Sequence, residues 1–408
     1  MEAGMDKKVI RSWCLYDLGN SAFAVLFPSV YGIYYGTKIV TGEEDGLGDL
    51  WWGRVISVSM LAVAVSAPFL GGIADHAGVR KKLLALYTVV AIAAVLCIPT
   101  VAPGMILTGF FIGVIANFAF EGGIVFYNAY LPEIAPKSHH GRISAKGYAT
   151  GYVGSLVALV YAAVFAGIEM IDLIWIALAL QWGFAALPAF KTLPADRPTG
   201  TGFFAAARDG FRTTRQTIRD VWGMRDLRWF FIAYFFYMDG VITVINFSSR
   251  YATKTLGFTL TEAMGLLALV QISALAGSLI MAGPTDRKGP KWTVRLILLW
   301  WIGVVIAAYF AQTKLVFTGV AVLAGLGLGS IQAASRAFMS RLIPPGREGE
   351  MFGFYGLCGK SGAILGPMLF GVISFNLGQR PAILSVAAFY IVGYLLLEKV
   401  RTDGTVSP

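Results

Sequence analysis

The sequence predicts an all-α membrane protein with twelve transmembrane helices in two six-helix halves and with both termini in the cytoplasm. Its composition is the first observation: 57% of the 408 residues are hydrophobic, 14% are charged and the mean hydropathy is +0.68. In soluble domains about 25% of the residues are charged. Twelve apolar runs are the second observation, since a helix needs roughly 20 apolar residues to cross a bilayer. The third is a loop motif that occurs twice, half a chain apart.

The apolar runs give the order of the expected helices. In the first half, spans are expected at residues 12–36, 51–73, 83–101, 105–131, 146–167 and 172–190. In the second half, they are expected at 228–252, 262–283, 292–311, 315–338, 352–374 and 381–397. The halves are therefore residues 1–191 and 228–408. The arginine-rich linker between them, 192–227, is expected to contain an amphipathic surface helix.

The repeated loop motif indicates that the two halves share one plan. Its first copy, in GGIADHAGVRKK, contains Gly71, Asp75, Gly78, Arg80 and Lys81. Its second copy, in AGPTDRKGPK, contains Asp286, Gly289 and Lys291. These three residues follow the acid, the second glycine and the first base of the first copy by the same 211 residues. Both halves cross the membrane six times, so we expect a parallel repeat with a site near the midplane between the halves.

The distribution of Lys and Arg predicts the orientation. If the N-terminus is cytoplasmic, 26 of the 33 Lys and Arg residues lie on the inner side and six on the outer side, with Lys360 inside a span. Positive charge concentrates in cytoplasmic loops. The net charge of +10 is then explained by the inner leaflet, and nucleic-acid binding is the weaker interpretation.

Several site classes are not expected. The three cysteines fall within predicted spans and the three histidines in short loops, so no disulfide framework, metal centre or Ser-His-Asp site is predicted. We expect no cofactor, no enzymatic activity and a monomer. The first apolar segment is interrupted by Asp17 and Asn20 and lacks a small-residue cleavage site, so the first span should remain in the mature protein.

Four ionisable residues inside predicted spans stand out: Asp17, Glu121, Asp239 and Lys360. Each costs about 2.5 to 3.5 kcal/mol at a helix centre and therefore requires a partner or a function. Asp239 is near the midplane, where a carboxylate can bind and release a proton as a coupling site requires. It could instead cap an unwound turn at Gly240 or pair permanently with Lys360.

The other charges also leave alternatives open. Asp17, in a polar cluster with Asn20, could contact substrate or form an inner-gate pair. Glu121 precedes two glycines and could face a cavity or form a buried salt bridge. Lys360 is expected to pair with Asp17 or Asp239 in one conformational state.

Polar groups on further spans extend this candidate site. Asn128 is among them, on the fourth span. Arg336, on the tenth span, could clamp a carboxylate or phosphate in bidentate fashion or extend to the headgroups. Arg250, near the outer end of the seventh span, is expected to be an interfacial anchor.

Together these features resemble the major facilitator superfamily, whose inner loop after the second span has the form G-x-x-x-D-x-x-G-x-R-K. The chain departs from that pattern at His76, where Arg or Lys is usual. Four stretches resemble the branch that contains the autophagy-linked vacuolar amino-acid exporter and many bacterial transporters. They are WCLYDLGNSAF (13–23), FYNAYLPEI (126–134), YMDGVITV (237–244) and GLGSIQAASRAFMSRLIP (327–344).

The resemblance implies a secondary transporter that works by alternating access. The short loops and compact length indicate a bacterial protein and therefore a cytoplasmic membrane. The expected partners are a small organic solute such as an amino acid, protons and membrane lipids. Asp75 is expected to meet a helix N-terminus of the other half when the inner side is closed, while Arg80 and Lys81 pair with acids or headgroups. An amphiphile, lysolipid or drug transporter is the alternative, and a non-transporting membrane sensor is the alternative from another class.

Overall fold

All regular structure in the described part of the chain is helical, which confirms the predicted fold class. The computed structural model describes residues 6–41, 46–76, 78–134, 140–197, 202–343, 348–361 and 364–401. Within these ranges ten helices are long and apolar enough to cross a membrane. They correspond to all predicted spans except the first and the eleventh. The count of twelve spans and the side of each terminus stay predictions.

The chain forms two compact units. One comprises residues 1–41 and 58–213, and the other comprises 42–57 and 214–408. Helix α3 (Leu47–His76) therefore begins in the second unit and ends in the first. The predicted boundaries at residues 191 and 228 stay a prediction, but the segment that starts α3 belongs with the second unit.

The first unit is built from helices packed around α1. Asp6 caps α1 (Lys7–Leu26), because its Oδ1 accepts a hydrogen bond from the amide of Lys8 at 2.8 Å. Beyond α1, Pro28 lies in a π-helical turn, Phe27–Tyr31, consistent with the loss of a regular helical hydrogen bond at proline. The path continues as α2 (Gly32–Tyr34) and a second π-helical turn, Tyr35–Ile39.

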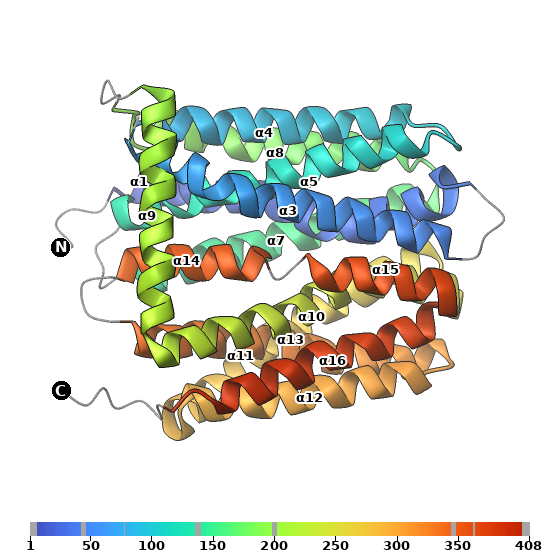
Figure 1. The fold of residues 1–408 in the computed structure, drawn as a ribbon. Coiled ribbons are helices and arrows are strands. Elements are labelled where there is room, and N and C mark those ends of the chain that lie inside the picture. Colours follow the sequence, from blue (N-terminus) through green and yellow to red (C-terminus); the bar gives the residue numbers. More distant parts are fainter. Residues whose placement is uncertain are drawn as a thin grey trace. The chain divides into compact units, whose positions relative to one another are not determined.

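The remaining helices of this unit are α4 to α8 (Figure 1). Helix α4 packs on α5 and α8, and α7 and α8 pack on α1. Their bounds are α4 (Arg80–Cys97), a 3-10 turn (Ile98–Thr100), α5 (Ile106–Asn128), α6 (Leu131–Ile134), α7 (His140–Gly167) and α8 (Asp172–Thr192).

The second unit repeats this plan, with α10 packed on α15 and α16. A capping box starts its second long helix, α11: Thr259 Oγ1 accepts from the Glu262 amide, and the Glu262 carboxylate accepts from the Thr259 amide. The helices of this unit are α10 (Arg225–Leu256), α11 (Leu260–Lys288), α12 (Pro290–Phe310), α13 (Lys314–Leu342), α14 (Glu348–Ser361), α15 (Leu365–Leu377) and α16 (Gln379–Glu398).

The predicted eleventh span is two helices instead of one. Helix α14 ends at Ser361 and α15 begins at Leu365, whereas the sequence predicted a single helix over 352–374. Pro367 explains the break, because proline lacks an amide hydrogen and its ring clashes with the carbonyl four residues earlier. The first amides of α15 are therefore left without partners inside the helix.

The linker contains the predicted surface helix. Helix α9 spans Phe203–Gly223 and separates α8 from α10. In the first unit it runs across the direction of α4 and α8 instead of along them (Figure 1).

Close helix contacts occur where glycines meet backbone atoms. A Cβ at Gly329 on α13 would collide with the carbonyl of Ala274 on α11. Gly154 on α7 approaches the backbone of Leu18 on α1 in the same way. Small residues allow such approach, and dispersion contacts then hold the helices together in lipid.

We expect Gly329→Ala to lower the free energy of unfolding by about 1 to 3 kcal/mol, because a backbone carbonyl cannot move aside for the new methyl group. Gly319→Ala, on the same helix, is the matched control, since no atom lies within 4 Å of its added Cβ. Thermal unfolding of both variants in detergent measures the difference. Equal midpoints would contradict the close α11–α13 contact.

Candidate functional site

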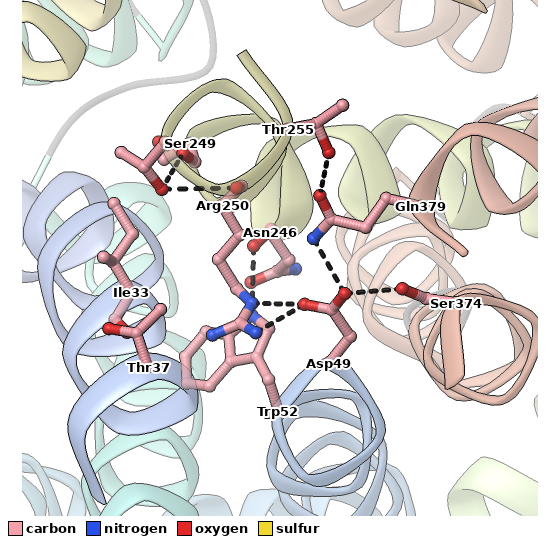
Figure 2. A network of polar contacts seen from close by, with 11 residues as sticks. Ile33, Thr37, Asp49, Trp52, Asn246, Ser249, Arg250, Thr255, Ser374 and Gln379 are labelled. Carbon is pink, nitrogen blue, oxygen red and sulfur yellow. Dashed lines mark hydrogen bonds and ion pairs between the residues drawn. The ribbon is translucent and has the colours of Figure 1, made fainter. Parts of the chain in front are cut away.

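A buried ion pair joins the start of α3 to α10 in the second unit (Figure 2). Asp49 Oδ1 accepts a hydrogen bond from Arg250 Nε at 2.7 Å. The two side chains are only 0% and 2% exposed. Such a pair is stable only when the remaining polar atoms also have partners.

The second carboxylate oxygen has two further donors. Asp49 Oδ2 accepts from Ser374 Oγ at 2.5 Å and from Gln379 Nε2 at 2.7 Å. The side-chain amide oxygen of Gln379, Oε1, in turn accepts a hydrogen bond from Thr255 Oγ1. Figure 2 shows Asp49 between Arg250 on one side and Ser374 and Gln379 on the other. We call Asp49, Arg250, Ser374 and Gln379 the α3 clasp.

Further contacts continue the clasp along the first turns of α3. Trp52 Nε1 donates to the carbonyl of Asn246 at 3.0 Å, and Ser57 Oγ donates to the carbonyl of Ile364 at 2.8 Å. Gly53 permits close approach, because a Cβ there would lie 2.5 Å from the Pro367 carbonyl. The first part of α3 is thus packed as an integral element of the second unit.

The expectation that Arg250 is an interfacial anchor is wrong. Its guanidinium is buried and paired, since Asp49 lies in the first turn of a helix and not in the outer loop where the sequence placed it. The available signal was the position of this arginine inside a predicted span, 228–252. The sequence could not choose among the four nearby acids Glu43, Glu44, Asp45 and Asp49.

Asp239 is buried in the second unit at the broken helix. Both of its carboxylate oxygens lie 2.9 Å from the amide nitrogen of Gly366, in the first turn of α15. A carboxylate satisfies the unpartnered amides and the positive dipole of a helix N-terminus. The proposed cap at Gly240 is therefore replaced by a cap on α15. The side chain of Lys360, the other predicted partner, lies outside the described residues.

Asp17 occupies the corresponding place in the first unit. A Cβ at Gly151 on α7 would lie 3.3 Å from the Asp17 carboxyl carbon and would also meet Ser21 Oγ. In the second unit, a Cβ at Gly366 would lie 2.8 Å from Asp239 Oδ1 and would also meet Thr243 Oγ1.

The two units therefore share one pattern. The first helix of each half carries an aspartate and, four positions later, a hydroxyl residue. Both side chains lie against one glycine on the fifth span of the same half. They differ in one respect: α7 is unbroken from His140 to Gly167, whereas α15 offers its first amides to the carboxylate.

The other predicted site residues are placed as follows. Asn20 is buried, and its Oδ1 accepts from Ser21 Oγ at 3.4 Å. Glu121 is half-buried on α5, and Asn128 at the end of that helix is exposed. Arg336 is exposed on α13 in the second unit.

The first loop motif connects three helices of the first unit. Arg80 Nη1 lies 2.8 Å from Glu133 Oε2 and 3.2 Å from the carbonyl of Ala129. Lys81 Nζ donates to the carbonyl of Leu193, just beyond α8. Asp196 accepts from the amides of Lys81 and Lys82 and so caps α4. Gly78 has φ +66°, which favours glycine.

The second motif makes one corresponding contact. Lys291 Nζ donates to the carbonyl of Val400, just beyond α16, as Lys81 does beyond α8. Lys291 thus corresponds in its contact to Lys81, although the spacing matched it to Arg80. Gly289 again has positive φ, +88°. Gly71, Asp75 and Asp286 lie in helices, but their side-chain surroundings fall outside the described part of the chain.

Comparisons with known proteins agree with this fold. The "Uncharacterized MFS-type transporter YxiO" of Bacillus subtilis (strain 168) is 28% identical, over 96% of each chain. The solved structure of the nucleoside transporter NupG has a TM-score of 0.72 at 16% identity, covering 97% of this chain and 99% of that one. The structure of a D-xylose-proton symporter has a TM-score of 0.69 at 11% identity, covering 96% and 95%.

These similarities and the helical membrane fold define the class: an integral membrane transporter of the major facilitator superfamily, which is not an enzyme. Residues 54–404 match the family model described as "Vacuole effluxer Atg22 like". The chain belongs to this family. The resemblance to the superfamily and to its Atg22-like branch is thereby confirmed.

We expect Arg250→Gln to lower the free energy of unfolding by about 3 to 5 kcal/mol, because it leaves the Asp49 carboxylate buried without its cation. Thermal unfolding and folded yield in detergent measure the loss. The double variant Asp49→Asn with Arg250→Gln should recover part of it, since no unpaired charge remains.

The matched control is Lys314→Gln, which removes the exposed pair of Lys314 and Glu262 in the same unit. It should change the midpoint little, because exposed ion pairs contribute little to stability. If Arg250→Gln and Lys314→Gln unfold at the same midpoint, the clasp is not a stabilising element.

Proposed function

We propose that the protein is a proton-coupled secondary active transporter that moves a small organic solute by alternating access. The observation that carries this proposal is the repeated carboxylate pattern, with Asp17 and Asp239 each set against a glycine of the fifth helix of its half. Ionisable groups at such positions are costly in a membrane and mark ion or substrate pathways.

The geometry at Asp239 supports a link between proton binding and helix position. Its carboxylate accepts from the Gly366 amide at 2.9 Å, so the ionised form would hold the start of α15 directly. Proton binding would weaken that acceptor and favour release of the end of α15. Because Gly366 has no side chain, the Asp239 carboxylate contacts the backbone of α15 directly.

The proposed solute is an amino acid or a similar zwitterion. A carboxylate such as Asp17 or Glu121 can bind an ammonium group, and Arg336 can bind a carboxylate in bidentate fashion. Asn20, Asn128 and Lys360 are proposed to complete the site. Two structural neighbours, a nucleoside transporter and a D-xylose-proton symporter, support a small polar cargo and proton coupling. The bacterial relative supports a location in a bacterial cytoplasmic membrane.

The α3 clasp is proposed as the outer gate. Helix α3 runs unbroken from the second unit into the first, so an outward-open state requires its first turns to leave α10, α15 and α16. Release would separate the Asp49 carboxylate from Arg250, Ser374 and Gln379. The loop motif at the other end of α3 would then bias the inner side, in accordance with the sequence expectation.

The coupling proposal is tested by a thermal-shift screen at two pH values, followed by uptake into proteoliposomes. A ligand at a hundredfold excess over Kd stabilises the folded state by about 2.7 kcal/mol. We expect Asp239→Asn to retain solute exchange but to lose accumulation driven by a pH gradient. Asp172→Asn, at an exposed helix start, is the control and should keep both. Gradient-driven accumulation by Asp239→Asn would refute the assigned role.

The gate proposal is tested by labelling Ser249→Cys, at a side chain that is 2% exposed on α10, in a background without the native cysteines. Adding Asp49→Asn should raise the rate of labelling by an impermeant maleimide about tenfold, which corresponds to about 1.4 kcal/mol in the gate equilibrium. Adding Lys314→Gln should leave the rate unchanged. An unchanged rate with Asp49→Asn in the folded fraction would show that the clasp does not control outer access.

A further inference from the structure

Helix α9 exposes an apolar stripe along one face. Phe204, Phe211, Ile218 and Trp222 are 87%, 48%, 44% and 59% exposed. Their spacings of seven, seven and four residues place them on one face, since a helix has about 3.6 residues per turn. The buried edge of the helix lies elsewhere, at Val221, which is 2% exposed.

A row of arginines runs beside this stripe. Arg208, Arg212, Arg215 and Arg219 are all exposed and are spaced by four, three and four residues. The acids Asp209 and Asp220 lie about 140 to 160° around the helix from Phe204, at roughly 100° per residue. The apolar stripe is therefore bordered by positive charge, and the acids lie away from it.

We propose that α9 lies in the headgroup layer of the membrane and binds the phosphates of anionic lipids through these four arginines. Helices with an apolar face and a basic flank bind the interface by burying the former and pairing the latter with anionic headgroups. The course of α9 across α4 and α8 agrees with a helix that lies in the membrane plane (Figure 1). This inference does not depend on the solute or on proton coupling.

Charge complementarity favours a lipid surface over a free anion. A soluble phosphate would use the guanidinium groups alone and would leave four large apolar side chains in water. A lipid leaflet accommodates the guanidinium groups and the apolar side chains at once, because the acyl boundary lies directly below the phosphates. The predicted concentration of Lys and Arg on the inner side assigns α9 to the cytoplasmic leaflet.

The test places a polarity-sensitive fluorophore on Ile218→Cys in full-length protein whose three native cysteines are replaced. The protein is reconstituted into nanodiscs of phosphatidylcholine alone or with phosphatidylglycerol. We expect a blue shift with phosphatidylglycerol at low salt that declines at high salt, because salt screens exposed charges. The same label on Gln216→Cys, toward the acidic edge, should not shift.

Replacing the four arginines by glutamine should abolish the response to phosphatidylglycerol. Each lost charge should lower the preference for the anionic lipid about fivefold. Equal emission in both lipids, or a response that survives these substitutions, would overturn the proposal. Inorganic phosphate added to the protein in detergent separates the two sources of phosphate. A full shift with phosphate alone would show a soluble-anion site and would also overturn it.

Discussion

The ion pair between Asp49 and Arg250 is the interaction on which the second unit depends. Two opposite charges are removed from water, and their desolvation is offset only because Ser374 and Gln379 satisfy the second carboxylate oxygen. This arrangement fixes the start of α3 against α10, α15 and α16. An apolar contact could hold the same helices together, but separating its partners would not leave an uncompensated buried charge.

The broken eleventh segment supplies the second constraint. Pro367 prevents a continuous helix, the break releases backbone amides, and the buried Asp239 satisfies one of them. In the first unit, the unbroken α7 gives Asp17 no such amide. The two halves thus share a position for an aspartate while giving it different electrostatic surroundings. A duplicated plan can in this way assign different roles to equivalent residues.

Much of the fold could be predicted from the sequence, because the length of an apolar run reflects the thickness of the membrane directly. The surface helix and the helices of the ten apolar spans lie where the runs placed them. The break before Pro367 was missed, since the apolar run continues through it and was interpreted as one span over 352–374. The pair of Asp49 and Arg250 was also missed, because a contact across 201 residues has no local signal. Asp17 and Asp239 could be selected as candidates, since charge inside an apolar run is itself a local signal.

Helix α3 has 30 residues and so measures about 45 Å at 1.5 Å per residue. Its first turns are held in one unit and its remainder lies in the other, so a movement of one end is transmitted along the helix to the other end. A tilt of about 5° at the clasp would displace the far end by about 4 Å over this length, more than the range of a hydrogen bond. A displacement at Asp49 would therefore reach the other end of α3 along the helix itself.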